Sequence, residues 1–189
     1  MNDKRICSWV GKDQIYIDYH NNEWGKPIYE DKLLFEFLIL DTFQAGLSWI
    51  TILKKRENFR EAFDHFDAEK ISNYNDDKFD ELMANAGIIR NRLKIKAAIG
   101  NAKAYLKIMD ETGSFSDYIW SFVGGKPIVN NWENQSQVPV STKESDAMSK
   151  DLKKRGFKFV GSTICYAFMQ AAGMVNDHST DCYLHAKYS

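Results

Sequence analysis

Residues 150–173 read KDLKKRGFKFVGSTICYAFMQAAG, and this stretch decides the predicted fold. A basic helix is expected to end at Gly156, a short hairpin to run to Gly161, and an apolar helix to begin at Ser162. Glycines let backbone N–H groups approach an anion closely, and the start of the second helix carries partial positive charge. The pattern predicts a phosphate clamp, so nucleic acid is the first partner to test. The candidate contacts are Lys154, Gly156, Lys158, Gly161 and Ser162.

The same stretch also fits a simpler arrangement, in which a surface helix ends at a glycine and a core helix follows. The formal net charge of the whole chain is only −1, so overall charge does not favour a nonspecific coat on nucleic acid. Any contact with DNA must therefore come from local basic patches.

Along the rest of the chain, helical spacing of apolar residues recurs and strand-like alternation is scarce. The prediction is an all-α fold in a single domain over residues 1–189, a central helical bundle with a lobe formed by the two termini. Helices are expected at 31–45, 47–56, 58–63, 67–72, 76–86, 90–110, 114–121, 142–155 and 162–172. The polar stretch 124–140 predicts a long loop or a short hairpin. Helix N-caps are expected at Asp67 and Asp76, and a capping box near Thr142.

The composition is that of a folded globular protein, because 44% of the residues are apolar and 14% are aromatic. No apolar run reaches the roughly 18 residues of a membrane span, and the first residues do not resemble a signal peptide. We therefore expect a cytoplasmic protein with no membrane partner. Three cysteines, far apart in sequence, argue against a disulfide framework and leave metal binding or free thiols.

Cysteine and histidine pairs lie near both ends of the chain, as Cys7 with His20 and His178 with Cys182. Zinc prefers such donors, and four protein ligands make a closed, structural site that pins the two ends together. The spacing of His178 and Cys182 suits one helical turn. The alternative is a buried cysteine with surface histidines. Cys165 lies in an apolar run and is expected in the core.

Aromatic residues are concentrated in the first quarter of the chain, at Trp9, Tyr16, Tyr19, Trp24 and Trp49. Such rings usually pack in a core, but they also build a slot for a flat, electron-poor ring. The carboxylate of Asp41 lies within an otherwise apolar run, where burial requires a partner. It is either a helix-end cap or solvated residue, or the hydrogen-bond acceptor at the bottom of a base pocket.

Several motifs together resemble one known family. They are Cys-x-Trp at 7–9, YHNNEWG at 19–25, QAGLSW at 44–49, KKREN at 54–58, AGIIRN at 86–91, KKRGFKFVG at 153–161 and VNDH at 175–178. These motifs span nearly the whole chain and resemble those of 3-methyladenine DNA glycosylase I, a family of the helix-hairpin-helix glycosylase superfamily. The blocks at 44–51 and 155–161 are highly specific when they occur together.

The resemblance implies a role for each cluster. Cys7, His20, His178 and Cys182 would carry one structural Zn²⁺. Trp9, Tyr16, Tyr19 and Trp49 would form the lesion pocket. Gln44, Gly46 and Leu47 would form the corner that enters the duplex, with Leu47 as the apolar filler. The segment 150–173 would grip the DNA. The expected partner is double-stranded DNA with alkylated bases, bound by a monomer.

The chain departs from the family pattern at Asp41, where members usually carry Glu. The acceptor is one methylene shorter, so the helix or base shifts, a water bridges the gap, or activity is reduced. Many glycosylases of the superfamily place an aspartate beyond the hairpin, where this chain has Asn176. Asp177 is expected to support the adjacent zinc ligand rather than to act as a nucleophile.

The expected activity is monofunctional hydrolysis of the N-glycosidic bond of 3-methyladenine, with Asp41 as the catalytic residue and the base flipped into the aromatic pocket. A noncatalytic, zinc-stapled module that recognises damaged DNA is one alternative, and a glycosylase weakened at Asp41 is another. A nucleobase-binding protein with no DNA role is a third, against which the basic hairpin argues. Salt-dependent binding to duplex DNA separates the third from the others.

Overall fold

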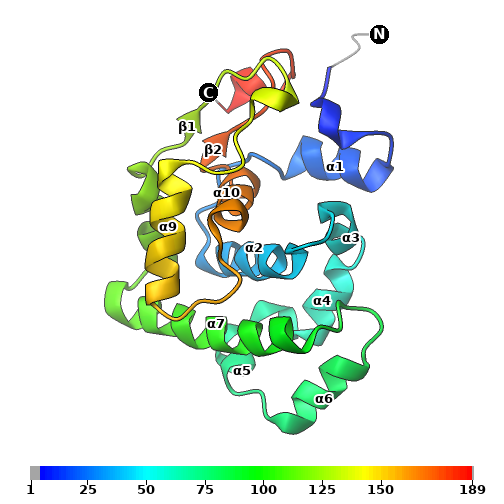
Figure 1. Ribbon diagram of the computed structural model, residues 1–189, viewed down its shortest axis with the longest axis vertical. Coiled ribbons are helices and arrows are strands. Elements are labelled where there is room, and N and C mark those ends of the chain that lie inside the picture. Colours follow the sequence, from blue (N-terminus) through cyan, green and yellow to red (C-terminus); the bar gives the residue numbers. More distant parts are fainter. Residues whose placement is uncertain (1–4, 189) are drawn as a thin grey trace.

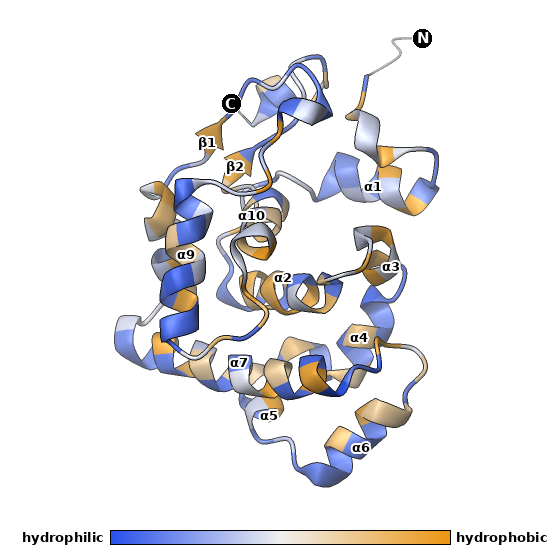
Figure 2. Ribbon diagram, viewed as in Figure 1, coloured by the Kyte–Doolittle hydropathy of each residue, from blue (hydrophilic) through white to orange (hydrophobic). Residues whose placement is uncertain are grey.

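The computed structural model describes residues 5–188, which are mostly helical (Figure 1). Helix α2 (Asp31–Gln44) runs through the middle of the molecule and is apolar along most of its length (Figure 2). Every residue from Leu34 to Phe43 is buried. A helix that is hydrophobic on all sides must be surrounded by protein. Asp41, a carboxylate in the last turn of α2, is therefore held at the centre of the fold.

The other helices surround α2. Their bounds are α1 (Gln14–Asn22), α3 (Trp49–Leu53), α4 (Arg56–Ala62), α5 (Ala68–Ser72), α6 (Asp76–Ala84), α7 (Arg92–Thr112), α8 (Phe115–Trp120), α9 (Lys143–Lys154) and α10 (Ser162–Ala171). Short 3₁₀ turns lie at Ser8–Val10, Asp64–Phe66, Ser121–Val123, Gln135–Gln137 and His185–Lys187. Each of the expected helices is present with ends shifted by a few residues. The helix expected at 47–56 is shorter than predicted, because α3 ends at Leu53 and α4, expected at 58–63, already begins at Arg56.

Helix α1 was not among the expected helices, although it carries residues of both predicted sites. It begins after Asp13, whose side chain accepts a hydrogen bond from the Ile15 N–H. The N-cap at Asp67 and the capping box between Thr142 and Ser145 are confirmed. The cap of α6 is Asn75 rather than Asp76, because the Asn75 side chain accepts from the Lys78 N–H.

One small sheet accompanies the helices. Strand β1 (Ile128–Val129) pairs in parallel with β2 (Val175–Asn176), so the alternative of a hairpin within 124–140 is wrong. Parallel strands need a long connection, and here α9 and α10 supply it. The pairing fastens the 124–140 loop to the segment that follows α10 (Figure 1).

The connection between α9 and α10 is held in place by α7. The buried Asn101 side chain donates to the Lys158 carbonyl at 3.1 Å and accepts from the Lys158 N–H at 2.8 Å. Ser149 Oγ donates to the Val160 carbonyl. Gly156 has φ +99, a conformation that side-chain-bearing residues rarely adopt. The backbone of this connection is thus fixed by specific contacts while Lys154 and Lys158 remain exposed.

The end of α2 is also capped by α7. Lys94 is buried, and its Nζ donates to the Phe43 carbonyl at 2.7 Å and to the Ala45 carbonyl at 2.6 Å. A positive charge at a helix C-terminus is favourable. The chain then turns at Gly46, with φ +79, and presents Leu47 with 41% of its surface exposed. Among the described helices, none is both long and apolar enough to cross a membrane.

Candidate active site and metal centre

A cavity of about 200 Å³ opens between α1, α2, α3 and α10. It gathers six of the predicted residues: Trp9, Tyr16, Tyr19, Asp41, Gln44 and Trp49. The remaining lining comes from residues that were not among the predicted site residues: Trp24, Gln135, Val138, Ala167, Gln170, Ala171 and Asp177. The predicted pocket residues therefore surround one space rather than packing in separate layers.

Aromatic rings form one wall of this cavity. Trp9 meets Tyr16 edge to face, with ring centroids 5.0 Å apart. Tyr16 and Tyr19, one helical turn apart on α1, are nearly parallel at 6.5 Å. Tyr19 lies 5.5 Å from Trp49 at the start of α3. Burial and neighbouring carboxylates raise the pKa of the Tyr19 hydroxyl, so the wall stays uncharged at neutral pH. A flat, electron-poor ring suits such a surface.

Asp41 lies beneath these rings with 2% of its surface exposed. Within the described part of the chain, Asp41 Oδ2 has no hydrogen-bond partner, and the same holds for Trp49 Nε1. Burial raises the pKa of the Asp41 carboxyl well above its usual range, because no charge within the protein offsets the loss of water. An unpaired buried acceptor and donor are costly, so their presence in one cavity marks a place for a polar ligand.

Asp177 is the second carboxylate of the cavity, and its hydrogen bonds are fully used. Oδ1 accepts from Asn130 Nδ2 at 2.7 Å and Trp132 Nε1 at 2.8 Å, while Oδ2 accepts from Tyr166 Oη at 2.6 Å and Gln170 Nε2 at 2.8 Å. The expectation that Asp177 supports a metal ligand is therefore wrong. It braces α10 and the 124–140 loop because its four partners lie on those two segments.

Asn176 does not reach the cavity lining. Its Nδ2 donates to the His185 carbonyl at 2.9 Å, and its Oδ1 accepts from the His178 N–H. The side chain is buried and holds the turn that follows β2. The Asn176 amide therefore has a structural role in this turn.

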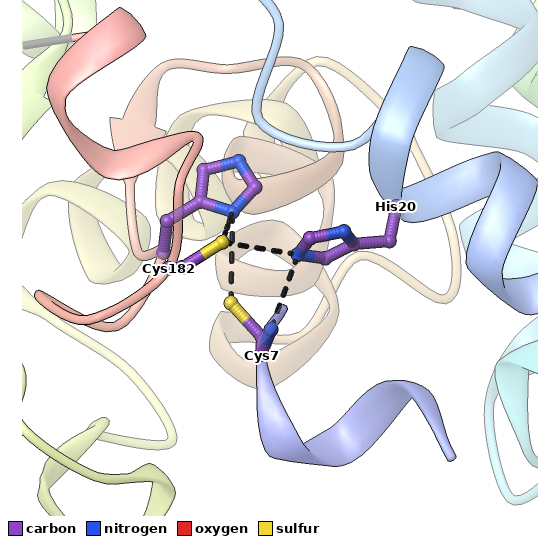
Figure 3. A group of neighbouring side chains, drawn as sticks. Cys7, His20 and Cys182 are labelled. Carbon is purple, nitrogen blue, oxygen red and sulfur yellow. Dashed lines mark hydrogen bonds between the residues drawn. The ribbon is translucent and has the colours of Figure 1, made fainter. Parts of the chain in front are cut away.

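The four Cys and His residues of the predicted metal site form one buried cluster, and their donor atoms all lie within 4.8 Å of one another. Figure 3 shows three of them, Cys7, His20 and Cys182, whose side chains point toward one another. Cys182 Sγ is 3.6 Å from both His20 Nε2 and His178 Nδ1, and Cys7 Sγ is 3.6 Å from His178 Nδ1. The spacing of His178 and Cys182 predicted one helical turn. That prediction is wrong, because neither residue lies on a helix. His178 immediately precedes a turn that ends at Cys182 and is closed by the hydrogen bond from the Cys182 N–H to the Ser179 carbonyl.

The cluster has the chemistry of a four-coordinate zinc site. Zinc bonds of about 2.0–2.3 Å in a tetrahedron place neighbouring nitrogen and sulfur ligands roughly 3.6 Å apart, which matches these distances. Zinc binds cysteine as the thiolate, and the sulfur atoms of Cys7 and Cys182 both face His178 Nδ1. His20 Nδ1 contacts Asn21 Oδ1 at 2.9 Å, which leaves Nε2 free to act as a ligand.

The metal cluster and the cavity share their aromatic residues. The Trp24 ring lies 4.7 Å from that of His178 and 4.9 Å from that of Trp9. Trp9 also packs edge to face on His20. The aromatic wall is therefore built directly on the histidines of the cluster.

The predicted DNA contacts fall on two segments near the cavity. Gln44 lines the cavity, and Gly46 and Leu47 follow it in an exposed turn. The other predicted contacts lie in the hairpin at the N-terminal end of α10. Lys154, Gly156 and Lys158 are exposed, and Gly161 and Ser162 are half-buried. The other end of α10 supplies cavity-lining residues, so one short helix connects the hairpin to the cavity.

Comparisons with known proteins agree with this geometry. A family model described as methyladenine glycosylase matches residues 9–185. The DNA-3-methyladenine glycosylase 1 of Escherichia coli (strain K12) is 54% identical over 176 residues, which is 93% of this chain and 94% of that protein.

Solved structures match over nearly the whole chain. A crystal structure of 3-methyladenine DNA glycosylase I has a TM-score of 0.94 and 51% identity, covering 96% of this chain and 100% of that one. A variant of 3-methyladenine DNA glycosylase I in complex with 3-methyladenine has a TM-score of 0.93 and 40% identity, covering 100% of both chains. The chain therefore belongs to the methyladenine glycosylase family, as an enzyme of the DNA-3-methyladenine glycosylase I type.

Proposed function

We propose that this enzyme removes 3-methyladenine from alkylated duplex DNA by flipping the base into the aromatic cavity and hydrolysing its N-glycosidic bond. The observation that carries the proposal is the unpaired Asp41 oxygen beneath the rings of Trp9, Tyr16, Tyr19 and Trp49. The matched proteins support it, because they are named for this activity and one of them is in complex with 3-methyladenine.

The charge of the substrate explains why such a cavity suffices. Adenine methylated at N3 is cationic in DNA, and breaking its bond to deoxyribose leaves a neutral base. Ring faces and an ionised carboxylate stabilise the cation, and the cation in turn offsets the cost of ionising buried Asp41. A normal base offers no such charge. The site therefore binds the charged, methylated base more tightly than a normal base. The difference is large because little water is present to screen the attraction between the base and the carboxylate.

The remaining residues of the cavity supply little additional catalytic machinery. The Asp177 oxygens are occupied by four donors, and Asn176 is held in a structural turn. Neither is placed to attack the sugar or to activate water in the present geometry. We propose that the positively charged substrate itself lowers the barrier, which restricts the enzyme to activated lesions.

DNA is proposed to bind across the α9–α10 hairpin and the corner after α2, as in helix-hairpin-helix glycosylases. Lys154, Lys158 and the N–H groups near Gly156, Gly161 and Ser162 would hold phosphates, with Gln44, Gly46 and Leu47 at the vacated base position. Cys7, His20, His178 and Cys182 would bind one structural Zn²⁺. We further propose a single-domain monomer, located in the cytoplasm where bacterial relatives would meet DNA.

Base release tests the proposal. Duplex DNA carrying radiolabelled methyl groups is incubated with pure protein, and the freed bases and the DNA strands are then separated. We expect free 3-methyladenine and abasic sites without strand cleavage. DNA binding without release would instead identify a noncatalytic damage-recognition module. Binding of free base without salt-dependent DNA binding would identify a nucleobase-binding protein.

A further inference from the structure

Gln170 projects from α10 into the lining of the cavity, next to Asp177. Its Nε2 donates to Asp177 Oδ2 at 2.8 Å. An ionised carboxylate has only lone pairs to offer, so the NH₂ end of the amide must face it and the oxygen must face away. The neighbouring carboxylate thereby decides the orientation of the Gln170 amide.

The other three donors keep Asp177 in this role. Trp132 Nε1–H can only donate, and Tyr166 remains protonated because burial and its hydrogen bond to Asp177 raise the pKa of its hydroxyl. Asn130 donates through its amide nitrogen. With four donors around its two oxygens, the carboxylate is fixed on both sides and has no freedom to rotate toward the base.

Gln170 Oε1 is left without a partner among residues 5–188. It is also not among the fully buried unpaired atoms, so it reaches open space. The cavity is the open space that Gln170 lines. The cavity therefore offers a second acceptor group in addition to the Asp41 carboxylate.

We infer that Gln170 Oε1 is a specificity-determining acceptor for the exocyclic amino group of the flipped base. That amino group carries two hydrogens, so it can donate to Gln170 Oε1 and to the Asp41 carboxylate at the same time. A purine with an oxygen at C6 would place its lone pairs against these acceptors. Asp177 is the positioning residue, because it acts on the base only through the Gln170 amide.

This inference rests on the proposed function, and paired ligands test it. Affinities of free 3-methyladenine and of 3-methylpurine, which lacks only the amino group, are measured for wild type and Gln170→Met. We expect the variant to lose on the order of tenfold in affinity for 3-methyladenine, and less than about twofold for 3-methylpurine. Gln14→Met, the same change at an exposed position of α1, should alter neither affinity.

The outcomes are distinguishable. Equal losses for the two ligands, or no loss for either, would overturn the inference, since a merely structural role cannot sense the amino group. Thermal melting confirms folding, and Gln170→Leu provides a second acceptor-free variant if Gln170→Met does not fold. Release of 3-methyladenine from duplex DNA by the wild type is scored separately. Its absence would reject the proposed function, whatever the free-base affinities are.

Discussion

At the scale of single residues, the buried carboxylate of Asp41 dominates the site. It is neither a helix cap nor a solvated residue, because it lies in the last turn of the most buried helix with one oxygen unpaired. The resemblance to the family identified this position, and the isolated charge in an apolar run drew attention to it. The sequence alone could not reveal that no protein donor reaches Oδ2, since that depends on side chains from other helices.

Replacing Asp41 with Asn should lower 3-methyladenine release by roughly 10- to 100-fold, because a charge-assisted hydrogen bond is lost. Asp41→Glu should release the base at least as fast as wild type, since its longer side chain reaches further into the cavity. Single-turnover release from methylated duplex DNA measures both effects. Wild-type rates in Asp41→Asn would show that the carboxylate takes no part in the reaction.

The same Asn substitution should stabilise the folded protein near neutral pH. The folded pKa of Asp41 is raised above the ordinary value of about 3.9, so its contribution to stability is present at low pH and is lost as pH rises toward the folded pKa. Asn does not titrate. The Tm advantage of Asp41→Asn should therefore be small near pH 4.5 and reach a few degrees by pH 7.5, on the scale of roughly 2–4 °C per kcal/mol.

Thermal melts across this pH range provide the measurement. Asp110→Asn, at an exposed position on α7, removes a carboxylate without changing the interior and should leave the pH dependence unaltered. A Tm difference between Asp41→Asn and wild type that does not change with pH would contradict the argument.

At the scale of elements, a long apolar run was sufficient for α2, and apolar periodicity was sufficient for α7 and α9. The ends of these helices lie within a few residues of the prediction. Helix α1 was missed because its sequence, QIYIDYHNN, mixes aromatic and polar residues in one short run. Its Tyr16, Tyr19 and His20 are held by contacts with other segments rather than by a periodic apolar face. The pocket and cluster residues of this short helix therefore replace the periodic apolar residues by which a helix is predicted from sequence.

Helix α10 contains a signal that could have extended the predicted pocket. Ala167, Gln170 and Ala171 are spaced three and four residues apart, which places them on one face of the helix. Small residues around one amide on an otherwise apolar helix indicate a surface that approaches a ligand. Gln135 and Val138 had no comparable signal, because their placement depends on the pairing of β1 with β2.

The anchoring of the hairpin by Asn101 can be tested at this scale. Asn101→Leu keeps the volume but leaves the Lys158 N–H and carbonyl without their partner, at a cost of about 1–3 kcal/mol. We expect affinity for undamaged duplex DNA to fall and affinity for free 3-methyladenine to be unchanged. Titrations at several salt concentrations measure the affinity for DNA. Fluorescence of the pocket tryptophans measures the affinity for free 3-methyladenine.

Asn73→Leu, at the exposed end of α5, is the matched control and should bind DNA as wild type does. If Asn101→Leu retains full DNA affinity at every salt concentration, then the hairpin needs no support from α7.

At the scale of the whole molecule, the Cys and His cluster joins segments 171 positions apart in sequence. Residue types alone indicated the four members, but spacing gave the wrong local structure for His178 and Cys182. Spacing reports helical periodicity, whereas a turn shaped by ligand geometry follows no fixed period. The resemblance supplied what spacing could not, namely that the two distant pairs belong together.

Loss of the metal should weaken the fold and the pocket together. We expect about one zinc per purified chain by elemental analysis, and Cys182→Ser should retain much less zinc and melt at a lower temperature. Because Trp9 and Trp24 pack on His20 and His178, affinity for 3-methyladenine should fall as well. Cys165→Ser, at the cysteine outside the cluster, should keep its zinc, and a zinc-free wild type would reject this assignment.

The distance between the paired ligands has a consequence for biosynthesis. Chains emerge from the ribosome starting at the N-terminus, at about 5–20 residues per second, so Cys7 and the tryptophans beside it appear many seconds before Cys182. Until shortly before then His178, one of the two histidines on which Trp24 packs, does not exist. The cavity of a nascent enzyme is therefore incomplete until the C-terminal segment, which supplies both α10 and the second pair of cluster residues, has been synthesised.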